Sequence, residues 1–412
     1  MTVFSNEERV KILADIVGMK TVNDNEIEVC HYLKDLFAQH GIDAEIDKVS
    51  ESRANLISTI GEGRPVVGIS GHMDVVSEGN ADEWTYDPFT LTEHEGYLYG
   101  RGAADMKSGL AALAIAMIEI KSAGDLKQGT IKFMATTGEE MEQLGSKQLY
   151  EQGHMDEVEA LIIAEPSETM LVYAHKGSMD FRITSKGLST HSSMPVLGKN
   201  AIQPLLTFIQ RIDNAYEALF EDVEGKALDF SNFISHMRDK IPSTIDQSQL
   251  ERLLSGPVIS NTLIEGGNQV NSIPEYASAD FNVRTVPEFD NEAMRRLFKK
   301  HLDEMNAENA QLEEDIYLDL EPVITTGDNA LVKLGHKLAE EHFQKSIALA
   351  PSVAVTDASN LLRGKDENFS FLMLGPGEDM HQVDEKVNKE TYLNFITYYI
   401  KLLTAYMDTT SE

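Results

Sequence analysis

The chain has 412 residues, enough for two domains, and its formal net charge of −33 at pH 7 argues against nucleic acid or anionic membranes as partners, since both need cationic surfaces. Its single cysteine excludes an internal disulfide framework and favours a reducing compartment, so we expect a cytoplasmic protein. No apolar stretch is long enough to cross a bilayer, and the N-terminus lacks the basic and apolar regions of a signal peptide.

The first part of the chain alternates helices with strands. Ser5 and Glu8 form a capping box for a first helix, and a second helix is expected over roughly 25–40. Strands and helices then alternate up to about residue 174. This alternation predicts a mostly parallel sheet with helices on both faces.

The middle of the chain has a different order of elements. Strands are expected at 179–185, 258–264, 277–286 and 316–320, and helices at 200–212 and 291–305. This β-α-β-β-α-β order is typical of a ferredoxin-like domain, here inserted between two parts of the larger one. We therefore predict an α/β chain whose larger domain covers 1–176 and 325–412, with an inserted α+β domain over 177–324. Within the inserted domain, residues 215–256 form an acidic, helix-rich extension without an assigned role.

Four buried strands of the larger domain are each followed by an acidic or imidazole side chain. The strands and the residues that follow them are 66–69 with His72, 131–135 with Glu139 and Glu140, 161–163 with Glu165, and 371–374 leading to His381. A further carboxylate, Asp105, precedes a long helical stretch. Ligands of open α/β sheets bind beyond the carboxyl ends of the strands, so we expect these groups to meet at one sheet edge. Together they are the ligand set of a two-metal hydrolytic site.

Taken singly, each motif also has an ordinary structural explanation. His72 alone is more often a hydrogen-bonded core histidine, Asp105 suits a helix N-terminus, and Glu139 with Glu140 suits a solvated surface. All five motifs, each with its flanking residues, follow the order found in one known family, so coincidence is a poor explanation. In that order the sequence resembles the M20 family of metallopeptidases and amidohydrolases, and most closely its group of succinyl-diaminopimelate desuccinylases and acetylornithine deacetylases.

The resemblance implies two Zn²⁺ ions and the residues that hold them. One ion would be bound by His72 and Glu165, the other by Glu140 and His381, and Asp105 would bridge the two. Nitrogen and oxygen ligands of this kind discriminate weakly between metals, so Co²⁺ or Mn²⁺ would suit the same site. The resemblance also implies that the peptide bond after Asp105 is cis.

Catalytic roles follow from the same resemblance. Glu139 would be the general base, and Asp74, two residues beyond His72, would orient its imidazole. The larger domain would thus be the catalytic domain, and the inserted one a lid and dimerisation domain. From the lid, His191 would donate a hydrogen bond to the reacting carbonyl, reaching in from the partner subunit in dimeric members. Asn271 would face the substrate.

Two cations, one in the lid and one just before it, point to a carboxylate on the substrate. Arg284 ends a strand, and family members use this arginine on the substrate carboxylate, which its fork suits through two charge-assisted hydrogen bonds. Without the resemblance, Arg284 is an ordinary surface arginine. Lys176 would meet a distal carboxylate, although desuccinylases carry two arginines where this chain has His175 and Lys176. Segment 355–359 also departs from the desuccinylase pattern, with Val-Thr-Asp-Ala-Ser in place of Gly-Thr-Ser-Asp-Gly.

The sequence therefore predicts a homodimeric, two-zinc hydrolase of an N-acyl amino acid. Desuccinylation of N-succinyl-LL-2,6-diaminopimelate is the most specific hypothesis, and hydrolysis of a dipeptide or of N-acetylornithine is the alternative within the family. A non-catalytic binding protein on the same fold is the alternative from another class. Such a protein is expected to have lost metal ligands or Glu139, and all of them are present.

Overall fold

The computed structural model describes residues 2–222, 227–238, 242, 245–378 and 380–409. The chain divides into two compact units. Unit 1 comprises Met1–Ala174, Thr325–Ala350 and Thr356–Glu412, and unit 2 comprises His175–Ile324 and Pro351–Val355. Parts of the extension predicted at 215–256 lie outside the described residues. Among the residues that are described, no helix combines the length and the apolar character that a membrane span requires.

Unit 1 is organised around an eight-stranded sheet. In sheet order its strands are β1 (Ala44–Lys48), β2 (Ala54–Glu62), β6 (Gly129–Thr136), β3 (Val66–His72), β7 (Ala160–Pro166), β14 (Ser370–Gly375), β8 (Met170–His175) and β13 (Ala348–Ser352). The four central strands β6, β3, β7 and β14 run parallel, while β1 with β2, β2 with β6, and β14 with β8 pair antiparallel. Every residue of β3 and β7 is buried, as expected for parallel strands covered on both faces.

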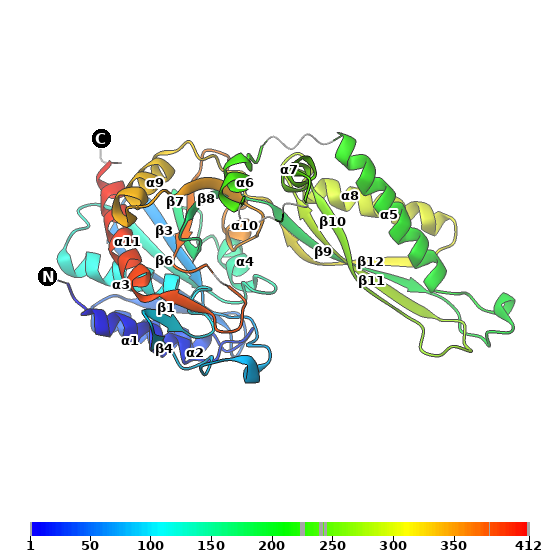
Figure 1. Cartoon of the computed structure of the whole chain (residues 1–412), viewed down its shortest axis with the longest axis horizontal. Helices are drawn as coiled ribbons and strands as arrows, with labels where there is room; N and C mark the ends of the chain where they lie inside the picture. Colours follow the sequence, from blue (N-terminus) through cyan, green and yellow to red (C-terminus); the bar gives the residue numbers. More distant parts are fainter. Residues whose placement is uncertain (1, 223–226, 239–241, 243–244, 379, 410–412) are drawn as a thin grey trace. The chain divides into compact units, whose positions relative to one another are not determined.

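Helices cover this sheet on both faces. They are α1 (Asn6–Val17), α2 (Ile27–Gln39), α3 (Lys107–Ala123), α4 (Leu144–Glu151), α9 (Ala330–Phe343), α10 (Ala358–Leu361) and α11 (Lys389–Thr409). Figure 1 shows α3, α9 and α11 on one side of the sheet and α4 and α10 on the other. Every residue of α3 from Lys107 to Ile120 is buried, because this helix packs on β2, β3, β6 and β7 and is covered in turn by α1 and α11.

A small second sheet in unit 1 joins two segments that are far apart in the sequence. Its strands, in order, are β15 (Lys386–Asn388), β5 (Tyr97–Tyr99) and β4 (Thr92–His94). The pairing of Lys386 with Tyr99 brings the segment that follows His381 beside the segment that precedes Asp105. The sequence did not predict this sheet, since three-residue strands carry almost no periodic signal.

Unit 2 has the predicted ferredoxin-like order. Its antiparallel sheet consists, in sheet order, of β10 (Val258–Gly266), β11 (Tyr276–Thr285), β9 (Gly177–Lys186) and β12 (Leu312–Leu320). Helices α5 (Ile202–Asp222) and α8 (Asn291–Ala307) pack on it, with Phe181 of β9 stacked on Phe298 of α8 at 4.1 Å between ring centroids. Helices α6 (Ser231–Met237) and α7 (Gln247–Ser255) lie between α5 and β10 in the chain. The two sheets confirm the predicted fold class.

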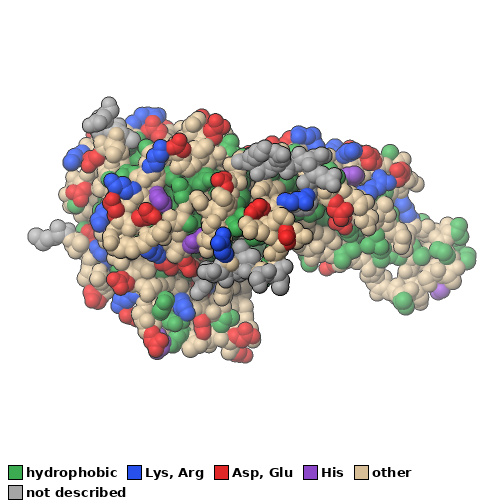
Figure 2. Space-filling model, turned by 45° about the horizontal axis from the view of Figure 1, so that its top comes forward, with side chains coloured by type: hydrophobic (Ala, Val, Ile, Leu, Met, Phe, Trp, Pro, Cys, Tyr) green, Lys and Arg blue, Asp and Glu red, His purple; other side chains and the backbone are tan. Residues whose placement is uncertain are grey.

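The acidic surface is broken up by basic side chains. On the face shown in Figure 2, aspartates and glutamates are scattered among lysines and arginines. Several acidic side chains of the chain form exposed ion pairs, such as Glu159 with Arg64 at 2.7 Å. Most of the negative charge of the chain therefore lies on a solvated surface. Exposed ion pairs of this kind contribute little to stability.

Candidate active site

Six predicted site residues lie together in unit 1, at the carboxyl ends of its parallel strands. They are His72 at the end of β3, Glu139 and Glu140 after β6, Glu165 near the end of β7, His381 after β14, and Asp105 before α3. Because β6, β3, β7 and β14 are neighbours in the sheet, their carboxyl ends form one edge, where α/β proteins bind ligands.

Asp105 lies between the two histidines. Its Oδ1 is 3.1 Å from Nε2 of His72, and its Oδ2 is 3.2 Å from Nε2 of His381. The peptide bond from Asp105 to Met106 is cis, as the resemblance implied. A carboxylate that offers one oxygen to each of two histidines has the arrangement of a group that bridges two cations.

Each of the remaining carboxylates lies near one of the two histidines. Near His72 Nε2 lie Glu165 Oε1 at 3.7 Å and Glu139 Oε2 at 4.0 Å. Near His381 Nε2 lies Glu140 Oε2 at 3.0 Å. Two groups of ligand atoms, one from His72, Glu139 and Glu165 and one from His72, Asp105 and Glu140, each fit within 4.8 Å. Imidazole nitrogens and carboxylate oxygens at these separations suit Zn²⁺ and related divalent metals.

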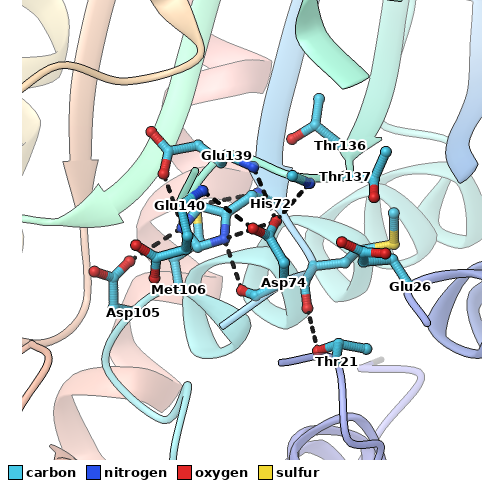
Figure 3. Close-up of polar contacts among 12 residues, drawn as sticks. Thr21, Glu26, His72, Asp74, Asp105, Met106, Thr136, Thr137, Glu139 and Glu140 are labelled. Carbon is cyan, nitrogen blue, oxygen red and sulfur yellow. Dashed lines mark hydrogen bonds and ion pairs between the residues drawn. The ribbon is translucent and has the colours of Figure 1, made fainter. Parts of the chain in front are cut away.

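Asp74 contacts this cluster differently from the prediction. The ring nitrogen Nδ1 of His72 is 2.9 Å from the backbone carbonyl oxygen of Asp74 and 3.7 Å from its carboxylate. The carboxylate instead accepts three backbone N–H bonds, from Gly138, Glu139 and Glu140, at 2.9–3.1 Å (Figure 3). Asp74 therefore fixes the turn that carries the two glutamates, while its main chain fixes the imidazole.

The electrostatics of the cluster favour a cation. Burial, together with the neighbouring carboxylates, raises the pKa of Glu139 and of Glu165 well above the usual value. Burial would also raise the pKa of Asp105, but hydrogen bonds from His381 and His72 hold it well below its usual range. Buried carboxylates that repel one another in this way are stabilised by a positive ion among them.

Glu385 is a site residue that the sequence analysis missed. It is buried, and its Oε1 accepts the backbone N–H groups of Ala104 and Asp105, both at 2.9 Å. Its other oxygen binds the guanidinium of Arg101. Glu385 thus ties the segment after His381 to the backbone of Asp105. The available signal was a glutamate four residues beyond a ligand, which is indistinguishable in sequence from a surface residue.

The other predicted residues lie in unit 2, where His191 and Asn271 are neighbours. Backbone N–H groups of Ser192 and Ile273 donate to the carbonyls of Asn271 and Thr190, at 2.9 and 2.8 Å. The Nδ1 atom of the exposed His191 accepts the backbone N–H of Ser193 at 3.3 Å. Because a backbone N–H can only donate, neutral His191 carries its proton on Nε2, where it is available as a donor.

Arg284 and Lys176 are partly or fully buried in unit 2. Burial lowers the pKa of Arg284, and its Nη1 has no hydrogen-bond partner among the residues that the structure describes. Lys176 instead donates to the backbone carbonyls of Leu253 and Gly256, at 2.8 and 2.7 Å, at the end of α7. The ammonium of Lys176 therefore caps a helix, whereas Arg284 keeps a donor unused.

Comparison with known proteins agrees with the site. Residues 68–405 match a protein-family model that is described as "Peptidase family M20/M25/M40". A probable succinyl-diaminopimelate desuccinylase of Staphylococcus epidermidis is 44% identical over 99% of this chain and 100% of its own length, and one of Staphylococcus aureus is 42% identical over 99% of each chain.

Solved structures share the fold. The M20 family metallo-carboxypeptidase Sso-CP2 of Sulfolobus solfataricus has a TM-score of 0.79 at 20% identity, covering 97% of this chain and 99% of its own. The Bacillus subtilis YXEP protein, described as a dinuclear metal-binding peptidase from the M20 family, has a TM-score of 0.65 at 18% identity, covering 98% and 99%. At such identities the likeness concerns the fold.

Proposed function

From the premise that the chain belongs to peptidase family M20/M25/M40, and is a metal-dependent hydrolase of amide bonds, we propose that it is a cytoplasmic enzyme that removes the succinyl group of N-succinyl-LL-2,6-diaminopimelate. The observation that carries the proposal is Asp105 between His72 and His381, with Glu139 beside them. Full-length relatives that bear the name of this activity support the choice of acyl group.

We assign the metal to zinc, with Co²⁺ or Mn²⁺ as substitutes. His72 and Glu165 would hold one ion and His381 and Glu140 the other, with Asp105 between them. Two such cations would lower the pKa of a water molecule and polarise the amide carbonyl.

Glu139 is the proton carrier of the proposed reaction. Its Oε2 faces His72, on the side where the water would lie, and takes a proton from that water as it attacks the amide carbon. The same oxygen then returns the proton to the leaving amine, so that succinate and a free amine are formed. The Nε2–H of His191 donates to the carbonyl oxygen as negative charge develops there.

Unit 2 would recognise the substrate as an anion. Arg284 has an unused donor and a planar fork that matches a carboxylate. We assign the carboxylate on the amino-acid side of the scissile amide to Arg284, with Asn271 near the amide. Lys176 receives no substrate contact in this proposal, because both of its donated bonds go to backbone carbonyls of unit 2.

We also propose that the chain is a homodimer through unit 2, in which His191 serves the partner's metal site. Exchange of subunits between a Glu139→Gln chain and a His191→Ala chain, each inactive alone, should restore part of the activity. A hybrid dimer holds one intact composite site, whereas either parent holds none. No recovery after confirmed exchange would place His191 in its own chain's site or outside the reaction.

A substrate panel tests the proposed function. The zinc-loaded protein is assayed on N-succinyl-LL-2,6-diaminopimelate, N-acetylornithine and dipeptides, before and after chelation and readdition of zinc, with Glu139→Gln as control. We expect the succinyl substrate to have the highest kcat/KM, the chelated protein to be inactive, and Glu139→Gln to keep its metal without turnover. A preference for dipeptides would make the protein a dipeptidase, and failure on every substrate would contradict the proposal.

A further inference from the structure

Gln143 is a buried residue beside Glu139 that the reaction described above does not use. Only 1% of it is exposed, although it directly precedes α4 in a polar stretch of sequence. Its side-chain Nε2 donates to Oε1 of Glu139 at 3.1 Å. The backbone N–H of Gln143 donates to the carbonyl of Gly138, which closes the turn that carries both residues.

The side-chain amide of Gln143 is held in one orientation. A carboxylate only accepts hydrogen bonds, so the amide nitrogen faces Glu139 and the amide oxygen faces away. That oxygen is 3.4 Å from the amide nitrogen of Asn360, which also donates to Ser146 Oγ at 3.1 Å. Ser146 in turn donates to the backbone carbonyl of Gln143 at 3.2 Å. Ser146 of α4 and Asn360 of α10 thus fix the orientation of the amide that donates to Glu139.

The backbone of Gln143 indicates that its side chain is needed. Its φ is +50°, in the left-handed region that favours glycine and that other residues adopt at a cost. Glycine would be the least strained choice at this position. A glutamine held there, with its side chain bonded to a neighbouring carboxylate, is the kind of local strain that clusters at functional sites.

The two oxygens of Glu139 therefore have different surroundings. Oε1 is occupied by Gln143, and Oε2 lies 4.0 Å from Nε2 of His72, toward the ligand cluster. We propose that Gln143 is a positioning residue that binds Oε1 of Glu139 and so presents Oε2 to the reacting water. This inference rests on the proposed function, because it assumes that Glu139 carries the proton.

Two substitutions of Gln143 separate this role from a structural one. Gln143→Glu has the same size and replaces the amide donor by a second carboxyl group beside that of Glu139. Gln143→Gly removes the side chain and relieves the backbone at φ +50°. In both variants kcat should fall roughly 10–100-fold, the loss typical of one hydrogen bond to a charged group, while KM and bound zinc stay within twofold. Thermal unfolding of each variant shows whether the fold survives.

Gln148→Glu is the matched control. Gln148 lies on α4, five residues further along, and its Nε2 donates to Asp47 Oδ2 at 2.7 Å. The same change therefore sets a carboxylate on α4 against the carboxylate of Asp47 on β1, away from the ligand cluster. We expect kcat, KM and zinc content of this control to stay within twofold of the native values.

A double substitution links the effect to Glu139. In the Glu139→Gln background, Gln143→Gly should lower the residual rate less than twofold, because the carboxylate it positions is gone. If Glu139→Gln is inactive while both Gln143 variants keep native kcat, the positioning role is overturned and the proposed function stands. If the Gln143 variants lose zinc but keep kcat per bound site, the residue supports the ligands and the inference is also overturned. If Glu139→Gln itself keeps its activity, the general base of the proposed function is wrong.

Discussion

Each unit has a cluster of buried titratable groups, and the two clusters are of opposite sign. In unit 1, burial raises the pKa of Glu139, Glu165 and Glu385, all of which surround one end of the large sheet. In unit 2, burial lowers the pKa of His175 to about 4 and that of Lys176 to about 7, close to Arg284. The same loss of solvation acts on both, and it opposes the charged form in each case.

This difference bears on the kind of ligand that each cluster can bind. Carboxylates that burial pushes toward neutrality regain their charge when a cation lies among them, and buried bases do so when an anion arrives. The carboxylate cluster of unit 1 therefore has the chemistry of a metal site, and the proposed function assigns the substrate carboxylate to Arg284 in unit 2. In a chain of net charge −33, an anionic substrate needs a local cation, which is the role that the proposed function gives to Arg284.

The largest effect is expected from Glu139. Glu139→Gln keeps the size of the side chain but accepts no proton, so kcat should fall by at least about 10²–10⁴ while two metals remain bound. Glu140→Gln, on the adjacent residue, should instead weaken metal binding, since Glu140 contacts His381. Kinetics together with metal analysis of both purified variants distinguish the two glutamates. Near-native kcat in Glu139→Gln would remove it from the reaction.

The anion site of unit 2 is tested by Arg284→Lys, which keeps the charge but loses the fork. We expect kcat/KM to fall roughly 10–100-fold, and amidation of the substrate carboxylate to cost the native enzyme a similar factor. The kcat/KM of Arg284→Lys should be nearly the same on the amidated substrate as on the free acid. Arg182→Lys is the control. Arg182 lies on β9 and donates two hydrogen bonds of 2.7 Å to the carboxylate of Asp280 on β11. Equal rates on the free and amidated substrates would contradict carboxylate recognition.

The support of the metal site is tested by Glu385→Gln. An amide has one accepting oxygen, so it cannot serve both the backbone N–H groups of Ala104 and Asp105 and the guanidinium of Arg101. Zinc affinity should fall roughly 10–100-fold, as is usual when the partner of a ligand is lost. A competition titration measures it. The control is Glu93→Gln, whose ion pair with Lys389 links β4 of the small sheet to the start of α11. Unchanged affinity in Glu385→Gln would refute the supporting role.

The smallest effect concerns stability and pH in unit 2. The pKa of Lys176 is lowered by burial, and then by Arg284, from 10.5 to about 7, so the unfolded chain binds more protons than the folded one between these values. Stability of the native protein relative to Lys176→Met should therefore rise as pH increases from about 7 to about 10. Denaturant unfolding of both proteins across that range measures the difference. A difference that stays constant with pH would show that Lys176 is not desolvated in this way.

The sequence predicted those parts of the site that follow from strand ends. His72, Glu165 and the pair Glu139 and Glu140 were located because apolar runs mark buried strands and parallel strands share one carboxyl edge. Glu385 could not be found, because its role depends on a three-stranded sheet whose strands are too short to show a period. Nor could Gln143, whose burial arises from packing between α4 and α10, elements distant in the sequence.

Two predicted side-chain contacts differ in the structure. Asp74 was expected to bind the imidazole of His72 through its carboxylate, but a tight turn at Gly138 presents three N–H groups to that carboxylate instead. Lys176 was expected to face the substrate, but the end of α7 offers it two carbonyls. In both cases the competing partners are backbone groups, which no side-chain pattern reveals.

Metal stoichiometry tests the central claim most directly. Demetallated protein is titrated with zinc by calorimetry, alongside Asp105→Ala. Two ions per chain should bind to the native protein, and the tight binding of both should be lost in the variant, because Asp105 offers one oxygen to each histidine. A native chain that binds one ion or none, or a variant that still binds two with native affinity, would contradict a bridged two-metal site in unit 1.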